Sequence, residues 1–374
     1  MKIIALEPIP ILVPLKQGLT TKTAHGEHID SPYVLLKVHT DAGLVGLGEA
    51  TLAPRWSGET SPGCVAVLRD VLAPAVIGAD PRDVRDIGLR VGKALRLNPF
   101  AKAAVEMACW DLAGKASGLP VYRLLGGRVR AAVPMKMVVG AFDVPRAVAL
   151  AKRFLDGGTR HLKVKVGLDP TQDIERVRAV RELAGPEITI GIDANCGWSP
   201  ATARRVLQEL QAFDILFAEQ PVGTDDPRAL AEVRAATTIP IMADESVFTP
   251  QQALEIVRLG AADILAVYPG KNAGISGSLA IAEIAAAAGL CCSMGSNLEL
   301  GIATAAMLHL AVACPTIDSE SYPGDLLGPL YHEADMITER LTLGPELALA
   351  PEGPGLGVEL DEDQVERFRD RSQP

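Results

Sequence analysis

The sequence predicts an α/β barrel preceded by a smaller α+β domain. From about residue 133, short apolar runs alternate with helix-start signals at a period of roughly 25 to 30 residues, as in strands followed by crossover helices. No G-x-G-x-x-G turn follows the first of these runs, as an open sheet with a nucleotide site would require. Before residue 126 the sequence pattern differs, because hairpin and helix patterns replace the alternation of strands and helices.

The first domain is expected to cover residues 1–126. The apolar segment Y-V-L-L-K-V-H at 33–39 leads into a turn at 41–43 and then into L-V-G-L-G-E-A, which is the pattern of a β-hairpin. A long helical segment follows at 101–115. The pair Gly126-Gly127 marks the expected boundary.

The barrel is expected to cover residues 127–341, with strand-like runs near 133, 163, 190, 217, 241, 266, 292 and 318. After each of the first five runs stands a capping residue followed closely by a proline. This combination begins a helix because the cap satisfies an orphan amide and proline lacks one. The segment 342–374, with the strand-like stretch P-G-L-G-V-E-L, is expected to pack back on the first domain. The five caps are Asp143, Asp169, Ser199, Asp226 and Thr249.

Composition and charge argue against several classes of function. The chain has 374 residues and a formal net charge of -10, so a basic surface that binds nucleic-acid phosphates is not expected. Its six cysteines include no C-x-x-C pair, which is typical of a reduced cytoplasm. Glu7 and early prolines interrupt a stretch that would otherwise resemble a signal peptide, and the apolar run at 301–315 is too short to span a bilayer. We therefore expect a soluble cytoplasmic homo-oligomer without nucleic-acid or membrane partners.

Carboxylates end three successive strands of the predicted barrel. Asp193, Glu219 and Asp244 close the third, fourth and fifth strands, and catalysis in such barrels occurs at the C-terminal strand ends. Because neighbouring strands converge there, we expect the three side chains to meet, and oxygen ligands of this kind suit Mg²⁺ or Mn²⁺ rather than Zn²⁺. Any one acid alone would more simply be a helix cap or an arginine partner. Glu245 is a rival ligand, although strand alternation should turn it away from the target of Asp244.

Two lysines lie on the strand that precedes the carboxylate strands. In H-L-K-V-K-V-G, Lys163 and Lys165 are two residues apart and therefore share a face. An exposed edge would be the ordinary explanation, but a closed barrel has no edge, so the pair is expected at the rim of the same cavity. Nearby positive charge and partial burial both lower a lysine pKa, which makes a lysine usable as a base near neutral pH.

The motifs quoted so far resemble the enolase superfamily, in particular its muconate lactonizing enzyme subgroup. The resemblance spans nearly the whole chain, and it implies a (β/α)7β TIM-like barrel under an N-terminal α+β capping domain completed by the C-terminal segment. It also implies one Mg²⁺ (or Mn²⁺) and a small carboxylate substrate. Further motifs that carry it are W-D-L-A-G-K, D-A-N, E-Q-P, A-D-E-S, K-N-A-G-I and G-S-N-L-E.

The resemblance also assigns roles to individual residues. It implies that Asp193, Glu219 and Asp244 are the metal ligands. The chemistry of the superfamily is proton transfer next to a carboxylate through an enediolate, for which Lys165 would be the acid/base. Lys163 would stabilise the enediolate charge, since a positive group held in advance lowers the energy of a developing negative one.

One position departs from the subgroup. Its members usually carry a lysine at the end of the sixth strand, 24 residues after the last metal aspartate, where this chain has Tyr268. The nearest lysine is Lys271, which is kept as an alternative replacement and as a substrate contact. Racemases of the subgroup use a lysine on each face of the substrate, so this loss favours chemistry with a single acid/base. Tyr268 is expected either to donate or orient a proton or to be a buried aromatic in the cavity wall.

Two further departures narrow the function. Dipeptide epimerases mark the eighth strand with D-x-D, but here only Asp325 remains in D-L-L. Mandelate racemase-like members use a His with an Asp partner on the seventh strand, which here ends in S-M-G-S-N, and His309 lies within an apolar helix. The leading hypothesis is therefore a cycloisomerase acting on a small carboxylic acid. A dehydratase, racemase or epimerase is the alternative, and a non-catalytic binding protein is disfavoured by the intact lysines and ligands.

The substrate contacts are the least determined part of the site. In this subgroup two loops of the capping domain shape specificity, here near 19–30 and 51–63. Trp56, Asn297 and Asp325 are the candidate contacts, together with Lys271. Packing or helix capping would explain each of the first three equally well.

Overall fold

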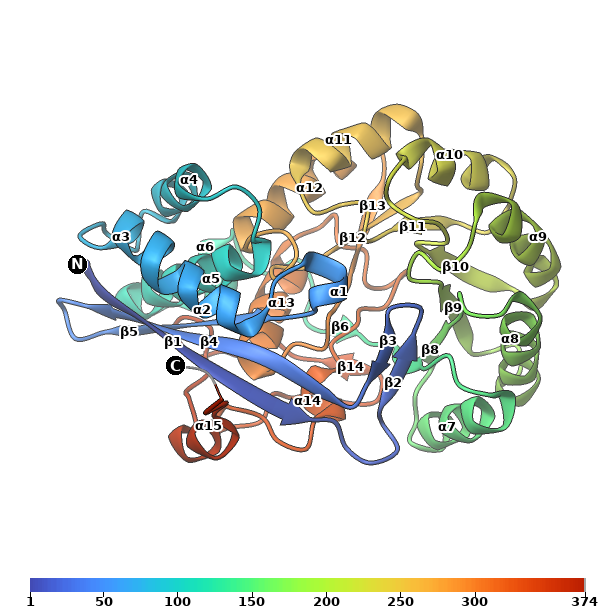
Figure 1. Ribbon diagram of the computed structural model, residues 1–374, viewed down its shortest axis with the longest axis horizontal. Helices are drawn as coiled ribbons and strands as arrows, with labels where there is room; N and C mark the ends of the chain where they lie inside the picture. Colours follow the sequence, from blue (N-terminus) through green and yellow to red (C-terminus); the bar gives the residue numbers. More distant parts are fainter. Residues whose placement is uncertain (373–374) are drawn as a thin grey trace.

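The computed structural model describes residues 1–372 and contains a curled parallel sheet surrounded by helices (Figure 1). The strands follow one another around the sheet in chain order, from β7 to β13. This order confirms the predicted barrel architecture. The strands are β7 (Met137–Val139), β8 (His161–Lys165), β9 (Thr189–Asp193), β10 (Ile215–Glu219), β11 (Ile241–Ala243), β12 (Ile264–Val267) and β13 (Cys291–Met294).

The helices of the barrel begin where the sequence predicts. The side chain of each of the five predicted caps accepts a hydrogen bond from a backbone amide in the first turn of its helix. Thr249 and Gln252 form a full capping box. The helices are α7 (Val144–Asp156), α8 (Pro170–Ala184), α9 (Pro200–Leu210, with the short η2 Gln211–Phe213), α10 (Pro227–Ala235), α11 (Pro250–Leu259), α12 (Ile275–Ala287) and α13 (Gly301–Ala313).

The eighth strand predicted near residue 318 is reduced to isolated bridges. Ile317 pairs in parallel with Cys292 of β13, and Gly324 pairs in parallel with Met135, just before β7. The barrel is thus closed by two short contacts and not by a continuous strand. Pro323 lies between them, and a proline has no amide to donate to a strand ladder. The short helix α14 (Gly328–Tyr331) follows.

The first domain packs helices on an antiparallel sheet of order β1-β4-β5. The predicted hairpin is present, because β4 and β5 pair from Tyr33 with Thr51 to His39 with Val45. Gly48 lets the sheet approach α5 closely, since a Cβ there would lie 1.9 Å from the Ala104 carbonyl oxygen. The strands are β1 (Ile3–Pro14), β2 (Thr21–Thr23), β3 (Gly26–His28), β4 (Asp30–Thr40) and β5 (Val45–Thr51); the helices are α1 (Pro54–Ser57), α2 (Ser61–Val67), η1 (Leu68–Leu72), α3 (Ala73–Val76), α4 (Val84–Ala94), α5 (Pro99–Ser117) and α6 (Val121–Leu124).

The C-terminal segment returns to the first domain, although not as the strand predicted for P-G-L-G-V-E-L. Gly355 and Gly357 have φ of +72° and +68°, which interrupts an extended chain. The Asp111 carboxylate of α5 accepts the Leu356 amide at 2.8 Å, which ties this turn to the first domain. The last helix, α15 (Glu362–Phe368), follows, and a bridge between Ile11 and Arg369 holds the segment against β1. A short strand β14 (Leu347–Ala348) pairs with β6 (Val133–Pro134).

Buried acids of the first domain cap two helices of the barrel. Glu49 of β5 accepts the amides of Leu300 and Ala303 at 2.7 and 3.1 Å, at the start of α13. Glu106 of α5 accepts two amides in the same way at the start of α12. A carboxylate stabilises a helix N-terminus because it pairs with unsatisfied amides and with the helix dipole. These contacts fix the first domain over the mouth of the barrel.

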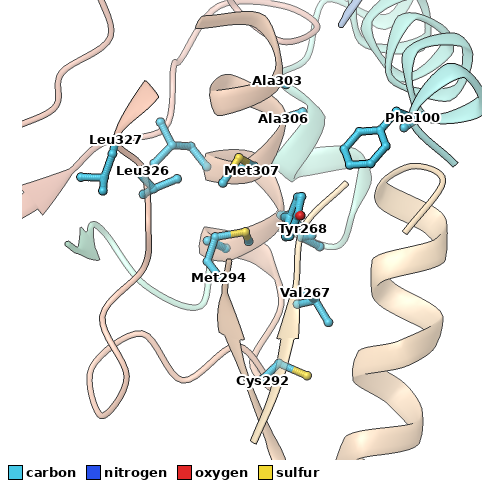
Figure 2. Packing of buried hydrophobic residues seen from close by; sticks show 14 of the residues in the cluster. Phe100, Val267, Tyr268, Cys292, Met294, Ala303, Ala306, Met307, Leu326 and Leu327 are labelled. Atoms are coloured by element: carbon cyan, nitrogen blue, oxygen red, sulfur yellow. The ribbon is translucent and has the colours of Figure 1, made fainter. Parts of the chain in front are cut away.

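Apolar side chains fill the junction between the two parts. Figure 2 shows Phe100 of α5 near Tyr268, at the end of β12, with Met307 of α13 and Met294 of β13 close by. All four side chains are buried. Among residues 1–372, every helix is too short or too polar to cross a membrane.

Candidate active site

The predicted lysines and carboxylates meet at one end of the barrel. Lys165 of β8 is paired in register with Asp193 of β9, and Asp193 with Glu219 of β10. Asp244 follows β11 directly. These residues and Lys163 all line one cavity of about 450 Å³, which lies under the first domain. The strand ends therefore bring the predicted residues to one cavity, although the ligand atoms of Asp193, Glu219 and Asp244 do not all lie within 4.8 Å of one another.

Lys163 is a fixed positive charge within this constellation. Its ammonium group donates to Asp325 at 2.5 Å and to Glu219 at 2.9 Å, and it lies 3.4 Å from Asp193. Burial alone would lower the pKa of Lys163, but the three carboxylates outweigh burial and hold that pKa well above its ordinary value. The sequence predicted a lowered pKa for both Lys163 and Lys165, and for Lys163 this prediction is wrong.

Lys165 is held less tightly and faces the cavity. Its ammonium group donates to Asp193 Oδ2 at 2.6 Å and to Asn195 Oδ1 at 2.9 Å. An ammonium group has three protons, so one remains for a substrate. The side chain is 13% exposed, compared with 4% for Lys163. Of the two lysines, Lys165 is the better placed to exchange a proton with a bound molecule.

The carboxylates form a set that suits a hard cation. Burial and the charge of Asp193 raise the pKa of Glu219 to about 7, and burial raises the pKa of Asp244 to about 6. Burial also disfavours the charged form of Asp193, but Lys165 and Lys163 lower its pKa to about 2. Buried acids that resist ionisation gain stability from a nearby divalent cation, and a donor set of carboxylate oxygens fits Mg²⁺ or Mn²⁺.

Lys271 forms a hydrogen bond with Asp244, one of these acids. Its ammonium group donates to Asp244 Oδ1 at 2.6 Å, to the Asp244 carbonyl oxygen at 2.8 Å and to the Ala266 carbonyl oxygen at 2.8 Å. The side chain is fully buried, and it does not line the cavity formed by the described residues. In this arrangement Lys271 has no proton left for a substrate.

A second group of possible ligands lies at the edge of the cavity. Side-chain atoms of His25, Cys196 and Glu245 lie within 4.8 Å of one another, and this is the one such His, Cys, Asp and Glu group within residues 1–372. A thiol and an imidazole are softer ligands than carboxylates, and Mg²⁺ and Mn²⁺ prefer carboxylate oxygens. His25 already shares a contact of 2.9 Å with Glu245, which joins the β2-β3 hairpin to the barrel. We therefore favour the carboxylate set as the cation site on chemical grounds.

The candidate substrate contacts divide into two sets. Trp56, Asn297 and Asp325 line the cavity, and Asn297 also donates to the Thr51 carbonyl oxygen at 3.2 Å. Tyr268 is fully buried, and like Lys271 it is absent from the cavity wall formed by residues 1–372. Its hydroxyl has no hydrogen-bond partner within the same part of the chain.

Sequence reasoning missed several residues of the site. Lys136 is buried next to β7, with its ammonium group 3.4 Å from Asp325 Oδ2. It carried the same signal as the lysine pair, a lysine within an apolar strand. Unlike Lys136, the residues His25, His28 and Asn195 line the cavity, and burial together with the charge of Lys165 lowers the pKa of His28. They lie in loops or at the end of the short strand β3, which leave no periodic signal.

Comparisons with known proteins agree with this fold. The family description "Mandelate racemase / muconate lactonizing enzyme, N-terminal domain" matches residues 7–126, and "Enolase C-terminal domain-like" matches 146–364. The chain is 32% identical to the N-succinyl-L-Arg/Lys racemase of Bacillus cereus, covering 98% of each chain. It is 33% identical to muconate cycloisomerase 1 of Rhodococcus opacus, covering 96% of this chain and 95% of that protein.

A solved structure of similar shape carries both a metal and a substrate. The dipeptide epimerase from Enterococcus faecalis, complexed with Mg and the dipeptide L-Leu-L-Tyr, superimposes with a TM-score of 0.91 at 33% identity, covering 96% of this chain and 100% of that chain. Fold and relatives together define an enzyme built on a capped barrel. The chain belongs to the mandelate racemase / muconate lactonizing enzyme family of the enolase superfamily.

Proposed function

We propose that this enzyme is a cycloisomerase that acts on a small carboxylic acid with Lys165 as its single acid/base. One observation carries the proposal. The end of the sixth strand, where the second lysine of two-base members lies, holds Tyr268 behind the ring of Trp56 and offers the cavity no titratable group. On the opposite side Lys165 lines the cavity with one ammonium proton free.

The two lysines have different parts in this mechanism. Lys165 holds the proton that is delivered to, or removed from, the carbon next to the substrate carboxylate. Lys163 keeps its charge throughout, because three acids surround it, and it stabilises the negative charge that develops on the substrate. A divalent cation held by Asp193, Glu219 and Asp244 would add a positive charge opposite the substrate carboxylate.

A racemase or epimerase acting on an amino acid derivative is the second candidate. The observation in its favour is Asp325, which lines the cavity and whose buried Oδ1 has no hydrogen-bond partner within residues 1–372. A buried carboxylate oxygen favours a ligand with an N–H donor. The similarity to a racemase at 32% identity adds to this support. A dehydratase remains a third use of the same acid/base.

Solvent deuterium distinguishes these activities. The protein is incubated in D₂O with Mg²⁺ and a panel of unsaturated dicarboxylic acids, lactones, hydroxy acids and N-acyl amino acids, and products are read by NMR. A cycloisomerase gives one deuterated stereoisomer, whereas a racemase scrambles the labelled centre. If no acid in the panel is turned over or labelled, the proposed function is wrong.

Replacement of Lys165 tests the acid/base directly. Lys165→Ala should abolish turnover and leave the Mg²⁺-induced rise in melting temperature in place, because its ammonium group is not a metal ligand. Lys152→Ala is the matched control, since Lys152 is an exposed lysine on α7 paired only with Asp156. Retained turnover in Lys165→Ala would contradict the assignment.

A further inference from the structure

An aromatic side chain from the first domain forms the cavity wall above the sixth strand. The residues from Thr51 to Trp56 all line the cavity, and Trp56 lies on the short helix α1. Its ring stacks on Tyr268, with the ring centroids 5.8 Å apart and the planes 14° from parallel. Tyr268 is fully buried and does not line the cavity formed by residues 1–372, whereas Trp56 stacks on it and does, so the indole covers Tyr268 on the cavity side.

Two more rings complete an aromatic cluster formed by Trp56, Phe100, Phe248 and Tyr268. Phe100 of α5 and Phe248, in the loop after β11, have centroids 5.8 and 5.5 Å from that of Trp56. Figure 2 shows Phe100 directed from α5 toward Tyr268. Ring pairs at such distances are mutually stabilising. The cluster therefore joins a loop of the first domain to two strand ends of the barrel.

The cluster is held by its rings and not by polar groups. Neither Trp56 Nε1 nor the Tyr268 hydroxyl has a hydrogen-bond partner among residues 1–372. A buried hydroxyl without a partner is destabilising, so any stabilisation of the cluster by Tyr268 comes from its ring. The Lys271 ammonium group lies 5.2 Å from the Tyr268 ring centroid and 5.9 Å from that of Phe248, within cation–π range of both.

We propose that Tyr268 is a positioning residue whose aromatic ring, and not its hydroxyl, holds Trp56 and the loop 52–58 against the barrel as a fixed wall of the cavity. The proposal rests on the proposed function only in taking this cavity as the catalytic one. The sixth-strand position then has a structural role, because it supports the loop that closes the substrate cavity. The substrate face above β12 meets an indole and no proton donor.

Limited proteolysis measures this without any substrate. Arg55 is an exposed trypsin site in the middle of the loop, next to Trp56. Cleavage after Arg55 is followed by mass spectrometry in Tyr268→Phe, Tyr268→Ala and Trp56→Ala, with rates normalised to synthetic peptides of each sequence. Tyr268→Phe should be cut at the wild-type rate. Tyr268→Ala and Trp56→Ala should be cut roughly tenfold faster, because the ring contacts that hold the loop are lost.

Control variants show whether a change in the cleavage rate is specific to the loop 52–58. Tyr322→Ala removes a ring that packs on Phe217 elsewhere in the barrel and should leave cleavage at Arg55 unchanged. If Tyr268→Ala fails to fold, Trp56→Ala still tests the contact from the loop side, and Tyr268→Leu keeps the bulk without the ring. Faster cleavage in Tyr268→Phe, or wild-type resistance in Trp56→Ala, would overturn the proposal.

Kinetics separate this proposal from the proposed function. For any acid that is turned over, Tyr268→Phe should keep both kcat and KM, whereas Tyr268→Ala should mainly raise KM because the cavity wall is loosened. A loss of kcat in Tyr268→Phe would assign the hydroxyl to catalysis and overturn the positioning role. If wild-type protein turns over no acid, the proposed function fails, and the proteolysis series still decides the role of Tyr268.

Discussion

Asp325 contacts Lys163 across the point where the barrel closes, and its Oδ2 lies 2.5 Å from the lysine ammonium group. Asp325 follows the bridged eighth position, whereas Lys163 lies on β8, two positions around the barrel. The contact fixes the orientation of Lys163, for which we propose the role of stabilising substrate charge. The other oxygen, Asp325 Oδ1, is buried and has no hydrogen-bond partner within residues 1–372.

Asp325→Asn is therefore expected to weaken catalysis without unfolding the protein. A buried hydrogen bond to a charged group contributes roughly 1.5–3 kcal/mol, so kcat/KM should fall about ten- to hundredfold. Lys163 keeps Glu219 and Asp193, but buried Lys136 loses the carboxylate 3.4 Å away, so the melting temperature should also fall while the protein stays folded. Steady-state kinetics on the identified acid measure the effect, and the exposed Asp225→Asn is the control. An unchanged kcat/KM would show that the contact is dispensable.

Glu49 makes stability depend on pH. Burial raises its pKa to about 8, even though two amides at the start of α13 favour the charged form. A folded-state pKa above the unfolded value means that the folded protein binds the extra proton, so this contribution to stability is lost as pH rises from about 4.5 through 8. Compared with Glu49→Gln, wild type should lose several kcal/mol between pH 5 and 9, at about 1.4 kcal/mol per unit of pKa shift.

Urea unfolding of both proteins at several pH values checks this expectation. At pH 5 the two should be similar, since a protonated Glu and a Gln each offer one good acceptor to the amides of Leu300 and Ala303. Parallel pH profiles for the two proteins would contradict the role of Glu49. Glu362→Gln is the control, because Glu362 is an exposed acid paired with Lys37.

Local patterns predicted most of the fold, and contacts distant in sequence explain the errors. Helix starts were predictable because a cap and a proline act within one turn. The strand expected at P-G-L-G-V-E-L fails because Gly355 lies against Asp111, more than two hundred residues away. The eighth strand fails for a related reason, since its pairing depends on both Cys292 and Met135.

The residues of the candidate site likewise include some that local patterns predict and others that depend on contacts distant in sequence. Asp193, Glu219 and Asp244 lie at successive strand ends and line one cavity, so this arrangement was predictable from their positions. The role of Lys271 was not predictable, because its three hydrogen bonds go to the ends of two neighbouring strands. The contact of His25 with Glu245 spans 220 residues and leaves no local signal.

Mg²⁺ is expected to stabilise the protein more at pH 8 than at pH 5.5. The raised pKa values of Glu219, about 7, and Asp244, about 6, mean that both hold protons at the lower pH, and a metal must displace them. Without metal, stability should fall as pH rises through this range, because the folded state binds more protons. At a hundred times the Kd, Mg²⁺ adds about 2.7 kcal/mol. Melting curves with Mg²⁺ or EDTA measure this, and Asp193→Asn should abolish the difference.

Gly355 is required for its backbone angle and for its lack of a side chain. A Cβ there would lie 2.1 Å from Asp111 Oδ1, and φ is +72°. Gly355→Ala should cost roughly 2–4 kcal/mol through both strain and overlap. Gly118→Ala is a matched control, because Gly118 has φ +68° with no atom within 4 Å, and it should cost only about 1–2 kcal/mol. Equal losses in urea unfolding would mean that overlap with Asp111 contributes nothing.

Lys271 allows stability and substrate binding to be distinguished in one variant. Lys271→Met keeps most of the side-chain volume but removes the donor for Asp244 and for two buried carbonyl oxygens. Leaving such groups unpaired costs roughly 3–5 kcal/mol, so we expect a large fall in the free energy of unfolding. If Lys271 instead bound the substrate, KM would rise while that free energy stayed the same. Urea unfolding together with KM therefore decides between the two roles, and Lys22→Met, on the β2-β3 hairpin, is the control for a lysine outside the barrel core.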